Sequence, residues 1–141
     1  MRVARAGLPR GEVPGAFDVG AAAYDRLVGA NPGYHANLRR SAERMRIPGR
    51  GKGLRLLDAG CGTGALSAAI AARDPAARII GVDLSEAFVA AARARVPAGR
   101  FLTGDITRLD LPDGGFDAVL SLLVLQFVPD RAAAVAEMAR Q

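Results

Sequence analysis

The chain has 141 residues, half of them apolar, with one cysteine and a formal net charge of +5; this composition favours one folded domain and excludes a disordered chain. No apolar run approaches the roughly 20 residues of a membrane-spanning helix, and one cysteine excludes an internal disulfide or a cysteine-based metal cluster. The surplus charge lies in residues 1–50, with nine arginines against four acidic residues, but no nucleic-acid motif or interleaved aromatics accompany it, which argues against a nucleic-acid partner.

The N-terminal part of the chain predicts an arm and two cover helices. Residues 1–15 are rich in glycine, proline and arginine and lack the apolar core of a signal peptide, so we expect a flexible arm on a cytoplasmic protein that has no membrane contact. Residues 16–53 are expected to form a helical lid and linker. The predicted parts are a helix over 17–28, a break at 31–33, an amphipathic helix over 34–45 with Leu38, Ala42 and Met45 on one face, and a linker over 48–53.

From residue 54 onward, strands alternate with helices. The predicted strands span 54–58, 78–82, 100–103 and 116–121, and the predicted helices span 65–73, the stretch after Ser85 and the stretch after Asp130. Ser85 and Asp130 are suitable N-caps, and Pro97 ends the helix that follows Ser85. Such alternation implies right-handed crossovers, so we predict an α/β fold with a doubly wound parallel sheet over 54–141.

We expect the last predicted strand to lie at the edge of this sheet. A single helix follows it and runs to Gln141 without a capping glycine or a return strand. Natural proteins avoid a bare apolar edge. We therefore expect an incomplete domain of about four strands, truncated at the C-terminus, and self-association through the unpaired edge.

The stretch from Leu56 to Gly64, Leu-Leu-Asp-Ala-Gly-Cys-Gly-Thr-Gly, carries the strongest functional signal. A buried strand runs into a Gly-x-Gly-x-Gly turn, with Asp58 two residues before the first glycine. Because glycine takes positive φ and has no Cβ, such a turn lets the backbone approach a ligand. No neighbouring base marks Cys61 as a nucleophile, so we interpret it as a small side chain that fits the turn.

Two further strand ends carry carboxylates. Ligands of open parallel sheets bind at the carboxyl ends of the strands, where the sequence places Asp83 and Asp105. Asp83 follows Gly64 by nineteen residues, a spacing at which a carboxylate binds a ribose diol. Leu84 and Ile106, the next residues, are suited to the faces of a flat base. These strand ends and the glycine turn predict a nucleoside cofactor site.

In combination, these motifs resemble those of the class I S-adenosylmethionine-dependent methyltransferases, in the small-molecule group that includes ubiquinone and menaquinone biosynthesis enzymes. The resemblance covers about residues 16–141 and rests on Leu56–Gly64, Gly81-Val82-Asp83-Leu84-Ser85, Gly104-Asp105 and Phe116-Asp117-Ala118-Val119-Leu120-Ser121. It implies a Rossmann-like fold, S-adenosylmethionine as the cofactor, and in-line transfer of its methyl group to a small-molecule acceptor.

The resemblance also implies a place for each candidate residue. The methionine part of the cofactor would contact the backbone of Gly60, Cys61 and Gly62, the carboxylate of Asp58 and the side chain of Ser121; the ribose would contact Asp83; and the adenine would contact Leu84, Ile106 and Asp105. Tyr24 would either reach the cofactor carboxylate from a lid or pack in the core.

The sequence departs from this family after its last helix, where the further strands that usually close the acceptor pocket do not follow. A non-catalytic remnant or interaction fragment is therefore one alternative. A nicotinamide-dependent oxidoreductase is another, because Gly60 to Ala65 and Asp83 also satisfy the dinucleotide fingerprint; Asp58, poorly suited to a pyrophosphate, argues against it. Displacement at a sulfonium methyl needs positioning more than a general base, so we assign no catalytic residue and expect His35 to be exposed or to cap a helix.

Overall fold

The computed structural model describes residues 20–44 and 53–141. The predicted arm over 1–15, the start of the first predicted helix, Met45 and almost all of the predicted linker over 48–53 lie outside the described residues. Within the described part, no helix is both long and apolar enough to cross a membrane.

A four-stranded parallel sheet forms the centre of the molecule. Its strands are β1 (Arg55–Ala59), β2 (Arg78–Asp83), β3 (Arg100–Thr103) and β4 (Ala118–Leu120), in the order β3-β2-β1-β4. In β1, Leu57 lies in register between Ile80 of β2 and Val119 of β4. The predicted α/β Rossmann-like parallel sheet is confirmed, and β4 lies at an edge of the sheet as expected.

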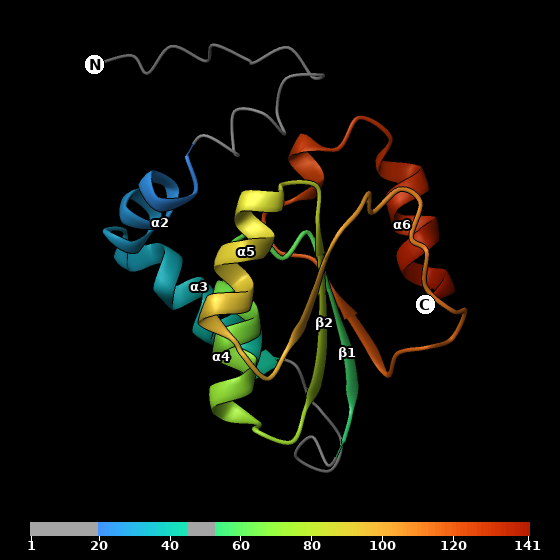
Figure 1. Cartoon of the computed structure of the whole chain (residues 1–141), viewed down its shortest axis with the longest axis horizontal. Helices are drawn as coiled ribbons and strands as arrows, with labels where there is room; N and C mark the ends of the chain where they lie inside the picture. The colour runs from blue at the N-terminus through green and yellow to red at the C-terminus, as the bar shows by residue number, and fades with distance from the viewer. Residues whose placement is uncertain (1–19, 45–52) are drawn as a thin grey trace.

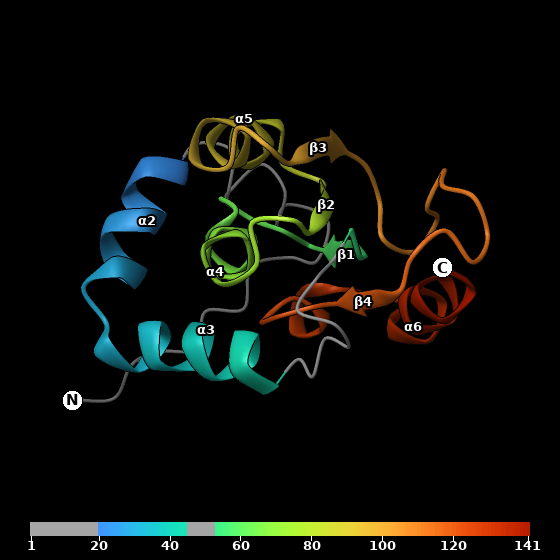
Figure 2. The same cartoon turned by 90° about the horizontal axis from the view of Figure 1, so that it is seen from below.

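Helices cover both faces of the sheet (Figures 1 and 2). The helices are α2 (Ala21–Gly29), α3 (Pro32–Arg44), α4 (Ala65–Arg73), α5 (Glu86–Arg95), α6 (Arg131–Arg140) and the short 3-10 helix η1 (Leu125–Phe127). Figure 2 shows α4 and α5 on one side of the strands and α6 on the other, with α2 and α3 beside the α4 and α5 layer. The strand order reverses at β1, so the sheet is doubly wound.

The core follows from the alternation of side chains along β1. Leu56 points to the α3 and α4 face, where it packs with Leu66 and Ile70. Its neighbour Leu57 points to the opposite face and packs in the cluster that contains Ala134 of α6. Since both faces of the central strand are buried, the apolar run predicted as a parallel-sheet strand is explained.

Most predicted boundaries agree with the structure. The hydroxyl of Ser85 accepts a hydrogen bond from the backbone N–H of Phe88 at 3.2 Å, and the carboxylate of Asp130 accepts one from Ala133 at 2.9 Å, so both predicted N-caps are confirmed. The fourth strand is shorter than its prediction of 116–121, because the N–H of Phe116 bonds to the carbonyl of Gln141 instead of to β1.

The predicted break at 31–33 is in fact the beginning of α3. The side chain of Asn31 accepts a hydrogen bond from the N–H of Gly33 at 2.9 Å, and α3 starts at Pro32. Proline suits the first turn of a helix, where its missing N–H would have no intrahelical partner. Leu38 and Ala42 are buried, which confirms the predicted inner face of this helix.

Candidate functional site

One cavity of about 400 Å³ lies at the carboxyl ends of the strands. This volume is within the range of small-molecule and cofactor sites. Every predicted site residue except Ser121 borders it: Tyr24, Asp58, Gly60, Cys61, Gly62, Asp83, Leu84, Asp105 and Ile106. The topology therefore gathers at one hollow residues that are up to 82 positions apart in the sequence.

The glycine turn forms one wall of the cavity. Glycine is needed at its three positions for different structural reasons. All three take positive φ: +79° at Gly60, +53° at Gly62 and +80° at Gly64. A Cβ on Gly60 would lie 2.4 Å from the side chain of Val124, and one on Gly64 would lie 3.0 Å from Ala92 of α5. Of the three, only Gly62 has room for a Cβ, whose nearest neighbour, Phe88, would lie at 3.9 Å. The backbone of Gly62 is therefore accessible to a ligand in the cavity, whereas the other two glycines allow the protein to pack against itself.

Asp58 lies at the end of β1 and is only 2% exposed. The hydroxyl of Ser67 on α4 donates a hydrogen bond of 2.6 Å to its carboxylate. Burial raises the pKa of Asp58 to about 6, with a smaller rise from the negative charge of Asp83 and a counteracting fall from the Ser67 hydrogen bond. A desolvated carboxylate of this kind gains from a cationic ligand group beside it.

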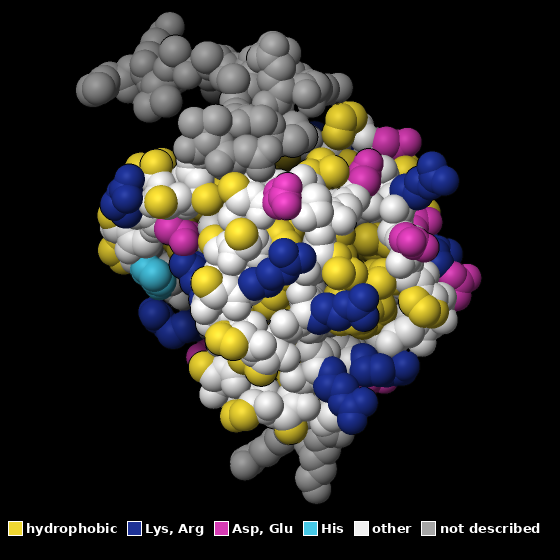
Figure 3. All heavy atoms as spheres, in the orientation of Figure 1, with side chains coloured by type: hydrophobic (Ala, Val, Ile, Leu, Met, Phe, Trp, Pro, Cys, Tyr) yellow, Lys and Arg dark blue, Asp and Glu magenta, His cyan; other side chains and the backbone are white. Residues whose placement is uncertain are grey.

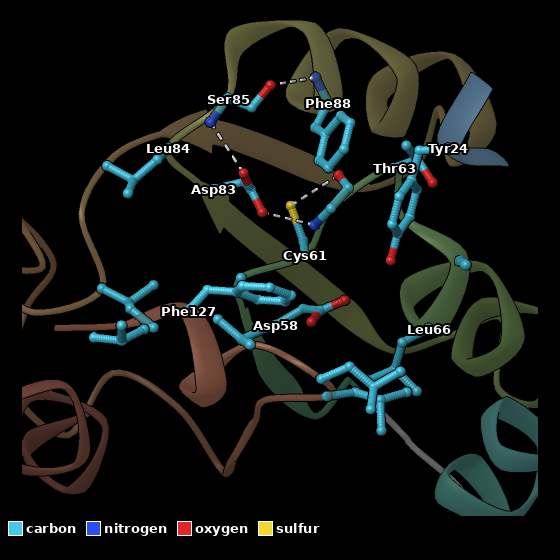
Figure 4. Close-up of a pocket in the computed structure, with 18 of the residues that line it drawn as sticks. Tyr24, Asp58, Cys61, Thr63, Leu66, Asp83, Leu84, Ser85, Phe88 and Phe127 are labelled. Atoms are coloured by element: carbon cyan, nitrogen blue, oxygen red, sulfur yellow. Dashed lines mark hydrogen bonds between the residues drawn. The ribbon is translucent and has the colours of Figure 1, made fainter. Parts of the chain in front are cut away.

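Asp83 links the glycine turn to the start of α5. Its two carboxylate oxygens accept hydrogen bonds from the N–H of Gly62 at 2.9 Å and from the N–H of Ser85 at 3.0 Å, as Figure 4 shows. These two hydrogen bonds fix the orientation of the carboxylate at the border of the cavity.

Asp105 follows β3 at the same end of the sheet. Its Oδ1 accepts hydrogen bonds of 2.8 Å from both the N–H and the hydroxyl of Thr107, so Oδ2 takes no part in these bonds. Ile106 is buried and Leu84 is 52% exposed. The two apolar side chains border the cavity together with Asp105.

Aromatic and aliphatic side chains complete the lining. Tyr24 of α2 projects into the space that Asp58 and Asp83 border from other sides (Figure 4). Its ring lies 5.2 Å from the ring of Phe88, and burial raises its pKa, with further rises from the charges of Asp25 and Asp83. Tyr24 and Phe88 both border the cavity. Tyr24 can therefore pack against Phe88 and face the cavity from the same position, so its two predicted roles do not exclude each other.

Sequence reasoning missed several lining residues. They are Tyr34, Leu38, Thr63, Leu66, Phe88, Leu122, Leu123, Val124, Phe127 and Asp130, among others. Tyr34 and Leu38 are four residues apart on the predicted cover helix, which is the spacing of one helix face. The segment after the fourth strand, which includes Phe127, also begins at the carboxyl edge of the sheet, and that position was a usable signal.

Of three further residues discussed from the sequence, Ser121 departs from its prediction, whereas Cys61 and His35 agree with theirs. Ser121 does not border the cavity, and its hydroxyl is buried without a hydrogen-bond partner among the described residues. Cys61 is buried, and burial raises the pKa of its thiol, so the turn interpretation agrees with its surroundings. His35 is exposed, and its Nε2 lies 2.9 Å from the carbonyl of Gly29 at the end of α2, as expected of a capping histidine.

Comparison with known families decides the ancestry of this fold. Residues 57–141 match the model of a family described as a methyltransferase domain. The chain belongs to this family. The family prediction made from the glycine turn and the strand ends is therefore confirmed.

Methyltransferases are also found among individual relatives. The chain is 38% identical over 121 residues to malonyl-[acyl-carrier protein] O-methyltransferase of Serratia marcescens, a match that covers 85% of this chain and 47% of that protein. The structure of SAM-bound CalS10, an amino pentose methyltransferase from Micromonospora echinaspora, matches with a TM-score of 0.66 at 38% identity, covering 85% of this chain and 50% of that one. The match thus spans about half the length of each of these two relatives.

A third match shows that a similar fold is found in a protein named for a different reaction. The structure of the [4+2]-cyclase SpnF matches with a TM-score of 0.78 at 26% identity, covering 94% of this chain and 56% of that one. One fold can support different chemistries. The reaction must therefore be argued from the residues at the cavity.

Proposed function

We propose that this chain binds S-adenosylmethionine in the cavity at the strand ends and acts as a methyltransferase on a small-molecule acceptor. The observation that carries the proposal is the convergence of Asp58, Asp83 and Asp105 with the open backbone of Gly62 on one hollow. A nicotinamide dinucleotide fits this set less well, because its pyrophosphate would meet carboxylates and no basic side chain among the described lining residues.

The adenosine half of the cofactor fits one end of the cavity. Asp83 is oriented by the N–H groups of Gly62 and Ser85 and borders the cavity, where its carboxylate is the group suited to the ribose hydroxyls. Leu84 and Ile106 provide apolar surface for the adenine ring. The Oδ2 of Asp105 is suited to accept a hydrogen bond from the adenine amine.

The methionine half fits the other end. Asp58 would face the ammonium group, and its desolvated carboxylate would be stabilised by that positive charge. Helix α4 has no side-chain N-cap, and its first residue, Ala65, borders the cavity. The positive end of the helix dipole therefore favours the carboxylate of the methionine half, and Tyr24 would contact the same group from α2.

When bound, the cofactor supplies a methyl group already activated by the sulfonium. The chain has to hold the acceptor in line with that group and keep water away, and such positioning can supply about 7–11 kcal/mol of a reaction barrier. Leu122, Leu123 and Phe127 provide apolar surface at the cavity for this purpose. We assign no general base.

The charges at the cavity favour one kind of acceptor. Among the described lining residues, Asp58, Asp83, Asp105 and Asp130 are acidic, and none is lysine, arginine or histidine. A free carboxylate beside the cofactor would meet repulsion without a cationic partner. We therefore propose that the acceptor presents a neutral or cationic group to this cavity.

We propose no macromolecular partner beyond a second copy of the chain. On the face shown in Figure 3, basic side chains lie mainly across the middle and lower right and acidic ones mainly along the top and right, and no nucleic-acid motif accompanies them in the sequence. Self-association through the edge strand β4 stays a prediction, as does the cytoplasmic location. Sedimentation at increasing concentrations tests the first of these.

Calorimetric titration of the full chain tests the proposed function. We expect S-adenosylmethionine and S-adenosylhomocysteine to bind and reduced nicotinamide dinucleotide not to bind. Gly62→Ala should weaken binding roughly tenfold or more, because a methyl group would enter the space the ligand needs, whereas Gly114→Ala, also at positive φ but away from the cavity, should bind normally. Binding of the dinucleotide alone, or of neither class by a folded sample, would overturn the proposal.

A further inference from the structure

Helix α2 is placed over the cavity although packing alone does little to hold it there. None of its residues is buried, and Leu27 on its outer side is 75% exposed. Most helices in proteins gain their stability from an apolar face packed on the core. A helix without such a face needs another attachment if it is to carry Tyr24 into a binding site.

Three polar side chains supply that attachment. The Nη2 of Arg95 on α5 lies 2.6 Å from Oδ2 of Asp25 on α2, and the hydroxyl of Thr63 in the glycine turn donates a 2.5 Å hydrogen bond to Oδ1 of the same aspartate. Arg95 closes the set, since its Nη1 donates to both the hydroxyl of Thr63 at 2.8 Å and its carbonyl at 3.0 Å. We call Asp25, Thr63 and Arg95 the latch.

The latch joins the lid helix to the wall of the cavity. Thr63 lies between Gly62 and Gly64, so the group that receives Asp25 belongs to the turn that borders the cavity. Asp25 directly follows Tyr24, whose ring rests against Phe88 near the start of α5. Fixing Asp25 therefore fixes the position from which Tyr24 enters the cavity.

We propose that Arg95 is a positioning residue that holds α2 over the cofactor turn through the latch and so sets the affinity of the cavity for S-adenosylmethionine. Arg95 does not border the cavity itself. Its effect passes through Asp25 and Thr63 to Tyr24. The part of the proposal that concerns affinity rests on the function proposed above. The part that concerns the position of α2 rests only on the geometry of the free protein.

The chain offers a specific probe of the lid. It contains no tryptophan and two tyrosines, Tyr24 and Tyr34, so Tyr34→Phe leaves Tyr24 as the single intrinsic fluorophore. In this background we expect Arg95→Met to raise quenching of Tyr24 by acrylamide roughly twofold, because α2 moves away and exposes the ring. The matched control is Arg93→Met on the same helix, since Arg93 donates to the carbonyl of Phe101 and does not belong to the latch.

Affinity gives the second readout. Arg95→Met, Asp25→Asn and Thr63→Val should each weaken S-adenosylmethionine binding roughly 5- to 20-fold, the usual size of coupling between two sites. The double variant Asp25→Asn with Arg95→Met should lose little more than either single variant, since both remove the same attachment. Arg95→Lys should lose less affinity than Arg95→Met, because a positive charge is retained. Thr63→Ser should lose much less affinity than Thr63→Val, because the hydroxyl is retained.

The two readouts separate this inference from the proposed function. If the wild-type chain binds no S-adenosylmethionine but Arg95→Met still exposes Tyr24, the proposed function fails and the latch stands. If the wild type binds and Arg95→Met changes neither quenching nor affinity relative to Arg93→Met, the latch is refuted. An affinity loss with unchanged quenching also refutes it, because Arg95 would then act on the turn alone; circular dichroism verifies that each variant is folded.

Discussion

The glycine turn and helix α2 meet at the same cavity, but different forces hold them in place. The turn is fixed by its backbone and by packing: the N–H groups of Gly60 and Cys61 both donate to the carbonyl of Val82, and Gly60 leaves no room for a Cβ beside Val124. Helix α2 has no buried residue and is joined to the turn through polar side chains. The site thus combines a rigid wall, which fixes where a ligand lies, with a cover whose position depends on a few polar contacts.

The largest expected effect tests the rigid wall. Gly60→Ala places a Cβ 2.4 Å from Val124 at a φ of +79°, so we expect a loss of about 3–4 kcal/mol in the free energy of unfolding, from overpacking together with backbone strain. Urea unfolding followed by circular dichroism measures it.

Gly114→Ala separates the two causes. Gly114 also has positive φ, +62°, but an added Cβ there meets nothing within 4 Å. It should therefore cost only the strain, about 1–2 kcal/mol. Equal losses in the two variants would mean that contact with Val124 does not fix the turn, and the contrast between wall and cover would be lost.

The wall is also the part of the site that sequence could predict. Glycine spacing, alternation of strands and helices, and a carboxylate at the ends of three strands are local patterns, and they predicted that Asp58, Asp83 and Asp105 lie at one edge of the sheet. Ser121, taken from the family resemblance alone, does not border the cavity.

The cover could not be predicted in the same way. The partners of Asp25 are Thr63 and Arg95, 38 and 70 residues away. No periodicity or spacing rule connects such positions, because the pairing depends on how α2 lies over α5 in three dimensions. The sequence predicted that α2 exists and carries a tyrosine, whereas the attachment of α2 to the turn required the structure.

The second prediction uses the buried carboxylate below the turn. Because the pKa of Asp58 is raised from 3.8 to about 6 in the folded chain, the folded state holds its proton more tightly than the unfolded state does. Its contribution to stability is therefore present below about pH 4 and is lost as the pH rises through 6. Asp58→Asn removes this titration while keeping an oxygen that can accept from Ser67.

We expect the free energy of unfolding of Asp58→Asn, minus that of the wild type, to rise by about 2–2.5 kcal/mol between pH 4 and pH 7, because the shift is worth 1.36 kcal/mol per pKa unit and most of it is lost in this pH range. Urea titrations at each pH measure this difference. The contributions of other titrating groups to the free energy of unfolding largely cancel, because they are the same in both proteins. A difference that stays constant with pH would show that Asp58 is not desolvated, and its proposed pairing with a cationic ligand group would lose its basis.

A smaller effect is expected from the partner of this carboxylate. Ser67→Ala removes the 2.6 Å hydrogen bond to Asp58 and should cost about 1–2 kcal/mol in the free energy of unfolding at pH 7. It should also raise the pKa of Asp58 further, since that hydrogen bond lowers it. Ser41→Ala on α3 is the control for the same substitution in a helix. A loss that does not shrink at pH 4, where Asp58 is protonated, would indicate packing rather than the charge as the cause.

The smallest effect is expected on the outer side of the cover. Leu27 is 75% exposed on α2, so Leu27→Gln should change the free energy of unfolding by less than about 0.5 kcal/mol and leave S-adenosylmethionine affinity unchanged in calorimetry. Asp25→Asn, two residues earlier on the same helix, should weaken that affinity as argued above. The two variants alter opposite sides of the same helix. If Leu27→Gln lost as much S-adenosylmethionine affinity as Asp25→Asn, α2 would be held by its outer surface. The cover would then be attached by apolar contacts like the wall, and the polar latch would not be the reason that Tyr24 lies in the cavity.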